Sequence, residues 1–319
     1  AELVELGVPD MWRYIKNPVD KAASELIVSQ QVFGRPFIAP PGIPEAALKT
    51  LREAFAKTMA DPEFKADAEK YMADYRLAID TVGKEPQVGP GPRPSISIKL
   101  SALHPRYEVA QRERVLTELF ANVLELATRA RALDVGISID AEEADRLELS
   151  LELYEKLLRA PALQGWGEIG LVVQAYSKRC LPVLVWLTLL GKELGAKMPL
   201  RLVKGAYWDS EIKRGQERGL PDYPVFTRKA ATDVSYLACA RAMLDAPGIY
   251  PAFATHNALT VATILNWAGE RRDFEFQRLH GMGGGLYERL MQEQGVAARV
   301  YAPVGGYRDL LAYLVRRLL

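Results

Sequence analysis

The sequence predicts an α/β protein built as a (β/α)8 barrel of the triosephosphate isomerase type with an extra N-terminal helical segment, on three observations. From about residue 95 onward, a short β-branched strand, a polar turn and a longer stretch of helical periodicity follow one another repeatedly. Such alternation is typical of βαβ units in a parallel sheet. Roughly seven units in about 225 residues, without the glycine fingerprint of a dinucleotide-binding sheet, favour a closed barrel.

Seven short apolar runs are the expected strands: Ser95–Leu100, Gly136–Asp140, Gly170–Tyr176, Leu200–Gly205, Tyr250–Thr255, Phe274–Leu279 and Arg299–Val304. Stretches with apolar residues at helical spacing are the expected helices. They are Val109–Ala132, Leu147–Leu158, Pro182–Leu194, Val225–Leu244, Ala258–Trp267 and Tyr307–Leu319.

An eighth strand has to come from the region before residue 95 if the barrel closes. The best candidate is Arg35–Ala39, followed by the helical region Glu45–Val82, although Pro36 makes it a poor central strand. The proline- and glycine-rich stretch Lys84–Pro94 is expected to be an exposed connector.

Composition excludes several classes of protein. The 319 residues are 49% hydrophobic and 25% charged, with a formal net charge of +1, so no basic field indicates nucleic acid. No apolar run reaches the roughly 18 residues of a membrane-spanning helix. The first ten residues lack the basic start of a signal peptide. We therefore expect a cytoplasmic enzyme.

Polar residues follow the expected strands, where the active site of a parallel barrel lies. They are Lys99, Asp140, Glu142, Glu143, Gln174, Arg201, Thr255, His256, Asn257, Gln277 and His280. So many converging polar groups are costly to bury unless a bulky polar ligand satisfies them.

Each of these residues also has a structural interpretation. Lys99 is suited either to a functional role or to an ion pair with Asp140, and Glu142 and Glu143 are suited to capping the following helix. The glycines within 281–285 fit a phosphate cradle or, more often, a turn.

Two further groups of residues leave alternatives open. A hydrolytic metal site built from Asp140, His256 and His280 is disfavoured, because metal sites in barrels need three or four convergent ligands. In the last expected helix, Arg316 and Arg317 either complement the helix dipole or grip a carboxylate.

Eight blocks in order resemble the proline dehydrogenase domain of the proline utilisation A family, and the resemblance runs from about residue 71 to 319. The blocks are Ser95–Tyr107, Ile139–Leu147, Val173–Tyr176, Arg201–Trp208, Thr227–Lys229, Ala254–Asn257, Gln277–Met282 and Leu311–Leu319. The family places a glutamate directly after these final leucines, so its absence from the sequence puts substrate gating or affinity in doubt.

The resemblance implies a non-covalent FAD across the barrel mouth. Its implied contacts are Gln174, Arg201, Val203, Lys204, Gly205, Tyr207, Trp208, Arg228, Lys229, Thr255, His256, Asn257 and Gln277.

The resemblance also implies the reaction, a hydride transfer from C5 of L-proline to the flavin that yields Δ1-pyrroline-5-carboxylate. Lys99, Arg316 and Arg317 would hold the substrate carboxylate, or that of a small carboxylate inhibitor, while Asp140, Leu279 and Tyr287 would surround the ring. A quinone is the implied electron acceptor, which leaves room for peripheral contact with the inner membrane.

Residues 1–70 carry a different resemblance. Gly34–Pro44 and Leu51–Phe64 are similar to the C-terminal part of tricarboxylate-transporter solute-binding proteins. This suggests a composite chain whose N-terminal segment supplies covering helices and the first strand. The alternative function that it implies is a binding module for a small carboxylate.

Overall fold

The computed structural model describes residues 17, 43–60, 62–85 and 93–304. The chain divides into two compact units, Ala1–Ala68 and Glu69–Leu319. The first includes helix α3 (Glu45–Ala60) and the start of α4 (Pro62–Lys84). The expected strand Arg35–Ala39 and the expected last helix Tyr307–Leu319 lie outside the described residues.

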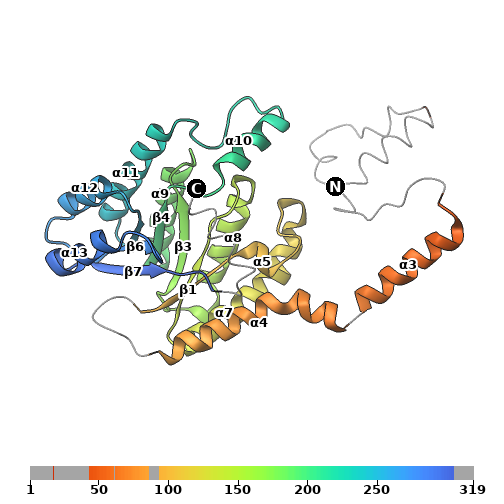
Figure 1. Cartoon of the computed structure of the whole chain (residues 1–319). Helices are drawn as coiled ribbons and strands as arrows, with labels where there is room; N and C mark the ends of the chain where they lie inside the picture. Colours follow the sequence, from red (N-terminus) through yellow and green to blue (C-terminus); the bar gives the residue numbers. More distant parts are fainter. Residues whose placement is uncertain (1–16, 18–42, 61, 86–92, 305–319) are drawn as a thin grey trace. The chain divides into compact units, whose positions relative to one another are not determined.

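The second unit contains a curved sheet of seven parallel strands in chain order (Figure 1). The strands are β1 (Ser95–Ile98), β2 (Gly136–Ile139), β3 (Ile169–Gln174), β4 (Met198–Val203), β5 (Ile249–Ala254), β6 (Glu275–Leu279) and β7 (Ala297–Tyr301). All seven expected strands are confirmed, with ends that shift by at most three residues. This is the α/β barrel architecture that the sequence predicts, with seven strands among the described residues.

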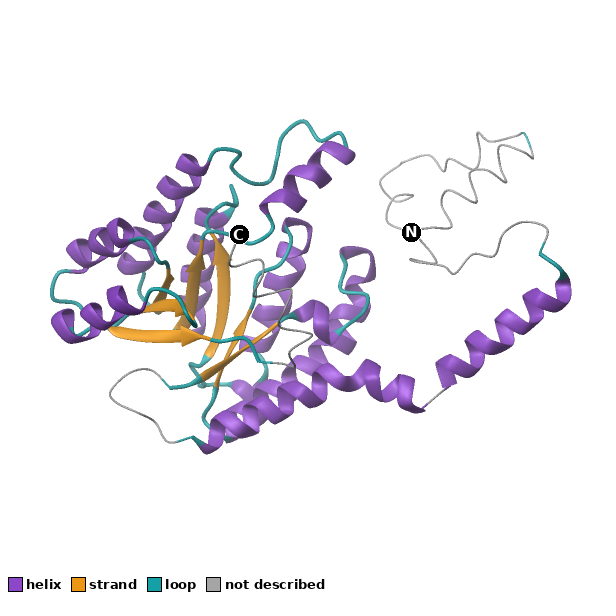
Figure 2. Ribbon diagram, in the orientation of Figure 1, coloured by secondary structure: helices purple, strands orange, loops and turns teal. Residues whose placement is uncertain are grey.

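Helices lie along the outer side of this sheet (Figure 2). The principal ones are α7 (Phe120–Ala132), α8 (Leu147–Leu158), α9 (Cys180–Leu194), α10 (Trp208–Glu217), α11 (Lys229–Asp245), α12 (Ala258–Ala268) and α13 (Gly284–Gln294). A short helix α5 (Leu100–Leu103) follows β1 directly. The expected helices that lie within the described residues are therefore present.

Two expected helices differ in detail from the prediction. The stretch expected as Val109–Ala132 divides into several helical pieces, among them a π-helical segment over Val115–Leu119, before α7 begins. Helix α11 begins at Lys229 and not at Val225, because Val225 forms an antiparallel bridge with Ser177. An extended backbone with a sheet-type partner cannot also make the first turn of a helix.

Side chains alternate along each strand, as the two-residue period of a strand requires. Ile96 and Ile98 of β1 point outward into the apolar core beneath the helices, whereas Ser97 reaches Arg201 on the inner side. On β6, Phe276 joins the outer core and Glu275 and Gln277 alternate with it. The sheet thus has an apolar outer face and a polar interior.

Helix α4 is fixed to the barrel at its C-terminal end. Ile79 is fully buried, and Arg76 makes a bidentate contact with Glu125 on α7 at 2.6 and 2.7 Å. The hydroxyl of Tyr75 accepts the backbone N–H of Lys99 at 3.0 Å. This helix therefore supports the residue that follows β1.

An aromatic cluster forms the centre of the outer core beside β5 and β6. Phe253, Phe274 and Phe276 are all fully buried, and their ring centroids are 5.7 to 5.9 Å apart. Ring pairs at such tilted, edge-on separations contribute about 0.5–1.5 kcal/mol beyond the area that they bury.

Phe253→Ala should lower the free energy of unfolding by about 3–5 kcal/mol, because it removes a ring from this cluster and leaves a cavity. Urea denaturation followed by circular dichroism measures the change. Leu189→Ala on α9, where the side chain is 62% exposed, is the matched control and should cost less than about 0.5 kcal/mol. Equal effects of the two substitutions would contradict this packing.

Candidate active site

A buried ion pair lies among the carboxyl ends of the strands. Arg201 on β4 donates from Nη1 to Asp140 Oδ1 at 3.1 Å, and from Nη2 to Ser97 Oγ on β1 at 2.7 Å. The side chains of Arg201 and Asp140 are 9% and 14% exposed. One guanidinium thus joins three strands or strand ends, and its hydrogen bonds partly offset the cost of burying the charges.

Tyr301 belongs to the same group, and the sequence prediction missed it. Its hydroxyl donates to Asp140 Oδ2 at 3.4 Å, and the Arg201 guanidinium lies 5.1 Å from its ring centroid. The signal that could have found it is the two-residue period of β7, which places Tyr301 on the same face as Arg299. The expected strand began at Arg299, and its alternation was not followed.

Lys99 lies at the exposed edge of this group. Its ammonium donates to the hydroxyl of Tyr207 at 2.9 Å, in the loop after β4. The sequence left open a functional role for Lys99 or an ion pair with Asp140, and in the structure Asp140 pairs with Arg201 instead. Lys99 therefore keeps donor capacity for a further anionic partner.

Burial and neighbouring charges act on the two groups differently. Burial raises the pKa of Asp140 above its usual range, although Arg201 and Lys99 favour its charged form. Burial would lower the pKa of Lys99, but the hydrogen bond to Tyr207 and the fields of Glu142 and Asp140 raise it. Lys99 is thus a cation at neutral pH.

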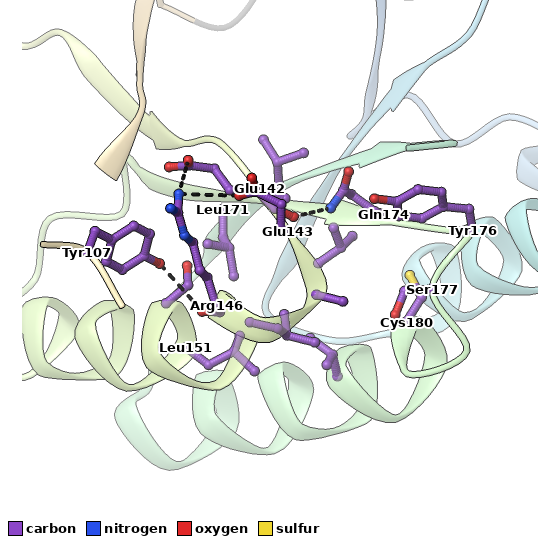
Figure 3. A pocket seen from close by; sticks show the side chains of 17 residues that line it. Tyr107, Glu142, Glu143, Arg146, Leu151, Leu171, Gln174, Tyr176, Ser177 and Cys180 are labelled. Atoms are coloured by element: carbon purple, nitrogen blue, oxygen red, sulfur yellow. Dashed lines mark hydrogen bonds and ion pairs between the residues drawn. The ribbon is translucent and has the colours of Figure 1, made fainter. Parts of the chain in front are cut away.

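The predicted ligand Gln174 joins two loops at the end of β3. Its Nε2 donates to the carbonyl of Glu142 at 2.9 Å, and its Oε1 accepts the N–H of Ala206 at 3.3 Å (Figure 3). The pocket beside it, between these loops and helices α8 and α9, has a volume of about 40 Å³, which is space for one or two water molecules. It is too small for a cofactor, so the candidate site is the strand-end group.

Glu142 and Glu143 do not cap the helix that follows them, so that expectation is wrong. Glu142 accepts the N–H of Ser101 at 2.9 Å, which supports the start of α5, and contacts Arg146 at 2.9 Å. Glu143 makes no side-chain capping hydrogen bond. Glu142 therefore supports the first turn of α5, an earlier helix in the chain.

The expected adenosine-side residues lie between β5 and α12. Asn257 caps α12 by accepting the N–H of Thr260 at 2.9 Å, and Thr255 Oγ1 accepts the N–H of Asn257 at 3.1 Å. His256 Nε2 accepts the N–H of Leu279 at 3.1 Å. Local hydrogen bonds therefore fix this loop, and its role toward a cofactor stays a prediction.

Tyr287 is buried on α13. Its hydroxyl lies 2.7 Å from the carbonyl oxygen of Thr255 and 2.6 Å from that of Gln277, so it joins the ends of β5 and β6. Its side chain is 1% exposed, and its predicted contact with the substrate ring stays a prediction. Gly281 and Gly283 have positive φ angles in the turn before α13, as the turn interpretation of the glycine run expects.

The loop after β4 gathers the expected pyrophosphate-side cations. Lys204 and Lys229 both contact Asp233 on α11, the second at 2.9 Å, and together they lower the pKa of that carboxyl. Trp208 is 42% exposed and donates from Nε1 to the carbonyl of Phe226 at 2.9 Å. Gly205 has φ +142°, and a Cβ there would lie 2.4 Å from the ring of Tyr176. Only glycine fits at that position.

Two polar atoms in the strand layer have no partner among the described residues. They are Nε of Arg201 and Oε1 of Gln277, in side chains that are more than nine-tenths buried. One is a donor and the other an acceptor, and an unpaired buried polar atom is costly. An isoalloxazine ring carries acceptors and an N–H donor at its edge, so these residues fit a flavin.

Neither a metal nor a membrane span is found in the described part of the chain. Its His, Cys, Asp and Glu side chains form no group of three that could hold a metal ion. No helix within the described ranges combines the length and the apolar composition needed to cross a bilayer.

Arg201→Gln should destabilise the protein by about 3 kcal/mol at pH 8, because it leaves Asp140 buried without its cation. The loss should be smaller at pH 5. Asp140 has a raised pKa in the folded state, so the folded protein binds a proton more tightly than the unfolded chain does. The stability that this gives is present at low pH and is lost as the pH rises through the folded-state pKa. Urea denaturation at both pH values is the measurement.

Arg129→Gln is the control, since it breaks the more exposed contact with Asp80 and should change stability far less. A loss from Arg201→Gln that is the same at pH 5 and pH 8 would contradict the assigned role of Asp140.

The chain is similar to known proteins over most of its length. A family model described as "Proline dehydrogenase" matches residues 51–319. The chain is 54% identical over 265 residues to "Bifunctional protein PutA" of Klebsiella aerogenes, which covers 80% of the chain and 20% of the relative. The corresponding protein of Rhizobium meliloti is 53% identical over 262 residues, or 80% and 21% of the two lengths.

A crystal structure of the proline utilisation A variant D779Y of Bradyrhizobium japonicum matches with a TM-score of 0.76 at 56% identity, over 79% of this chain and 26% of that one. The chain spans about a fifth of the length of the curated bacterial relatives it matches. The match to the family starts at residue 51 and not near 71, so residues 51–70 fall inside it. The chain belongs to the proline dehydrogenase family.

Proposed function

We propose that this chain oxidises L-proline to Δ1-pyrroline-5-carboxylate, the first step of proline catabolism to glutamate, with a bound FAD. The observation that carries the proposal is the buried pair Arg201–Asp140 at the strand ends, next to unpartnered atoms of Arg201 and Gln277. In a member of the proline dehydrogenase family, such a group is suited to a flavin and an amino acid.

FAD would supply the two-electron acceptor, taking a hydride from C5 of proline at flavin N5. Arg201, Gln174 and Gln277 would lie at the isoalloxazine, with Val203, Gly205, Tyr207 and Trp208 along it. Arg228 and Lys229 would face the pyrophosphate, and Thr255, His256 and Asn257 the adenosine side or ribityl chain. The cations at Arg201 and Lys204 would stabilise negative charge on the cofactor.

Lys99 would hold the substrate carboxylate together with Arg316 and Arg317, which lie outside the described residues. Its ammonium is exposed and is positively charged at neutral pH. Asp140, Leu279 and Tyr287 remain the proposed neighbours of the ring, and Tyr301 joins them through its contact with Asp140. Holding the carboxylate fixes the ring so that C5 can approach its acceptor.

Four parts of the proposal rest on the resemblance alone. A quinone would re-oxidise the flavin, and the protein would act in the cytoplasm or at the inner membrane surface. Small carboxylates would compete with proline. Residues 1–50 would derive from a solute-binding protein, and deletion of that segment tests whether the barrel needs it.

An anaerobic titration of the FAD-loaded protein with L-proline tests the proposed function. The flavin absorbance should bleach with L-proline and stay unchanged with D-proline. A protein that holds FAD but does not bleach would contradict the reaction. A protein that binds proline but takes up no FAD would support a binding module instead.

Lys99→Met should weaken the binding of L-proline, or of a small carboxylate inhibitor, by about 10- to 100-fold, because it removes a charged hydrogen bond to the carboxylate. The flavin should stay bound. Lys178→Met is the matched control, since Lys178 contacts Asp222 at 2.6 Å in another loop. The oxidised flavin spectrum, recorded as the inhibitor is added, gives the inhibitor affinity of both variants. Equal affinities would show that Lys99 does not bind the carboxylate.

A further inference from the structure

We propose that Glu275 and Arg299 are positioning residues that fix the side-chain amide of Gln277 in one orientation. The proposal rests on the proposed function, in which Gln277 contacts the flavin. Neither Glu275 nor Arg299 was among the residues expected at the site, and neither lies at the carboxyl end of the barrel. Glu275 lies two residues before Gln277 on β6, and Arg299 is the register partner of Gln277 on the neighbouring strand β7.

The three side chains form one connected row. Gln277 donates from Nε2 to Glu275 Oε1, two residues earlier on β6. Glu275 in turn receives both arms of Arg299 on β7, with Nε to Oε1 at 2.9 Å and Nη2 to Oε2 at 3.1 Å. Glu275 is 1% exposed and Gln277 6%, so both residues are buried in the interior of the barrel.

Chemistry fixes the direction of the amide. An ionised carboxylate only accepts hydrogen bonds, so Gln277 must turn its NH₂ group toward Glu275. The carbonyl oxygen Oε1 then points away from Glu275, and it is the atom that has no partner among the described residues. The bidentate guanidinium balances the charge of the carboxylate and holds it in place.

Arg299 also anchors the row to the other edge of the sheet. Its Nη1 donates to the carbonyl of Arg93 at 2.6 Å and to Ser95 Oγ at 3.1 Å, at the start of β1. Strands β7 and β1 stand at the two ends of the strand order, so this side chain links them across the barrel interior. The row therefore begins at Gln277 on β6 and is attached at its other end to the start of β1.

Among the described residues, Glu275 is the hydrogen-bond partner of the Gln277 side-chain amide, and Oε1 of that amide has none. A cavity of about 230 Å³ lies beside Glu275, Gln277 and Arg299, and small residues such as Gly136, Gly170 and Ala252 contribute to its wall. Without the carboxylate, the amide of Gln277 has room to rotate. Glu275 therefore fixes the orientation in which Gln277 presents its carbonyl oxygen Oε1 as a hydrogen-bond acceptor. An acceptor suits the single ring N–H of an oxidised isoalloxazine.

A double-mutant cycle on FAD affinity tests this. Glu275→Gln no longer dictates the direction of the amide, so the Kd for FAD should rise by about 3- to 10-fold, as for the loss of one hydrogen bond. Gln277→Leu should do the same. If Glu275 acts through Gln277, the double variant should bind FAD no more weakly than Gln277→Leu, within about twofold.

Glu168→Gln is the matched control, because Glu168 also lines the cavity but makes no hydrogen bond to Gln277. It should leave the Kd unchanged. Circular dichroism melting of each variant separates a folding defect from a change in affinity. Independent, multiplicative losses in the double variant, or an unchanged Kd in Glu275→Gln, would overturn the proposal.

A second measurement does not need the cofactor. In the flavin-free protein, the side-chain amide resonances of Gln277 are identified by their loss in Gln277→Leu. They should move in Glu275→Gln and stay in place in Glu168→Gln, and resonances that do not respond to Glu275→Gln would refute the contact. A wild-type protein that binds no FAD would instead contradict the proposed function, while these resonances still decide on the positioning role.

Discussion

The buried guanidinium of Arg201 is the interaction on which the rest of the site depends. It reaches Asp140 after β2 and Ser97 on β1, and it lies over the ring of Tyr301 on β7. A buried charge of this kind is costly unless every neighbour is placed to meet it. The alternation of the strands meets part of that requirement, because it directs apolar side chains outward and polar ones inward, and Nε of Arg201 is left without a partner among the described residues.

The polar interior is organised as connected rows. One row runs from Gln277 through Glu275 to Arg299 and the start of β1, and another runs from Tyr75 through Lys99 to Tyr207. Each row joins segments that are far apart in the sequence. The unpartnered atoms belong to Arg201 and Gln277, which is why a ligand is expected beside these residues and not in the small pocket beside Gln174.

The sequence predicted the strands and the polar strand ends well, because both follow from periodicities of two and 3.6 residues. It could not predict which charges pair. An ion pair of Lys99 with Asp140 was one of two open interpretations, and in the structure Arg201 on β4 pairs with Asp140 instead. The alternation of β7 indicates that Tyr301 and Arg299 share a face, but their contacts with Asp140 and Glu275 depend on the placing of the strand. The early start assigned to α11 failed because the bridge of Val225 with Ser177 is not a local property.

The central claim is that these buried polar atoms are completed by a flavin, and calorimetry of the flavin-free protein with added FAD tests it most directly. A ligand that binds only the folded state stabilises it by about 2.7 kcal/mol at a hundredfold excess over Kd. The account predicts a melting temperature that rises with FAD concentration and rises less in Arg201→Gln. A melting temperature that does not respond to FAD would contradict it.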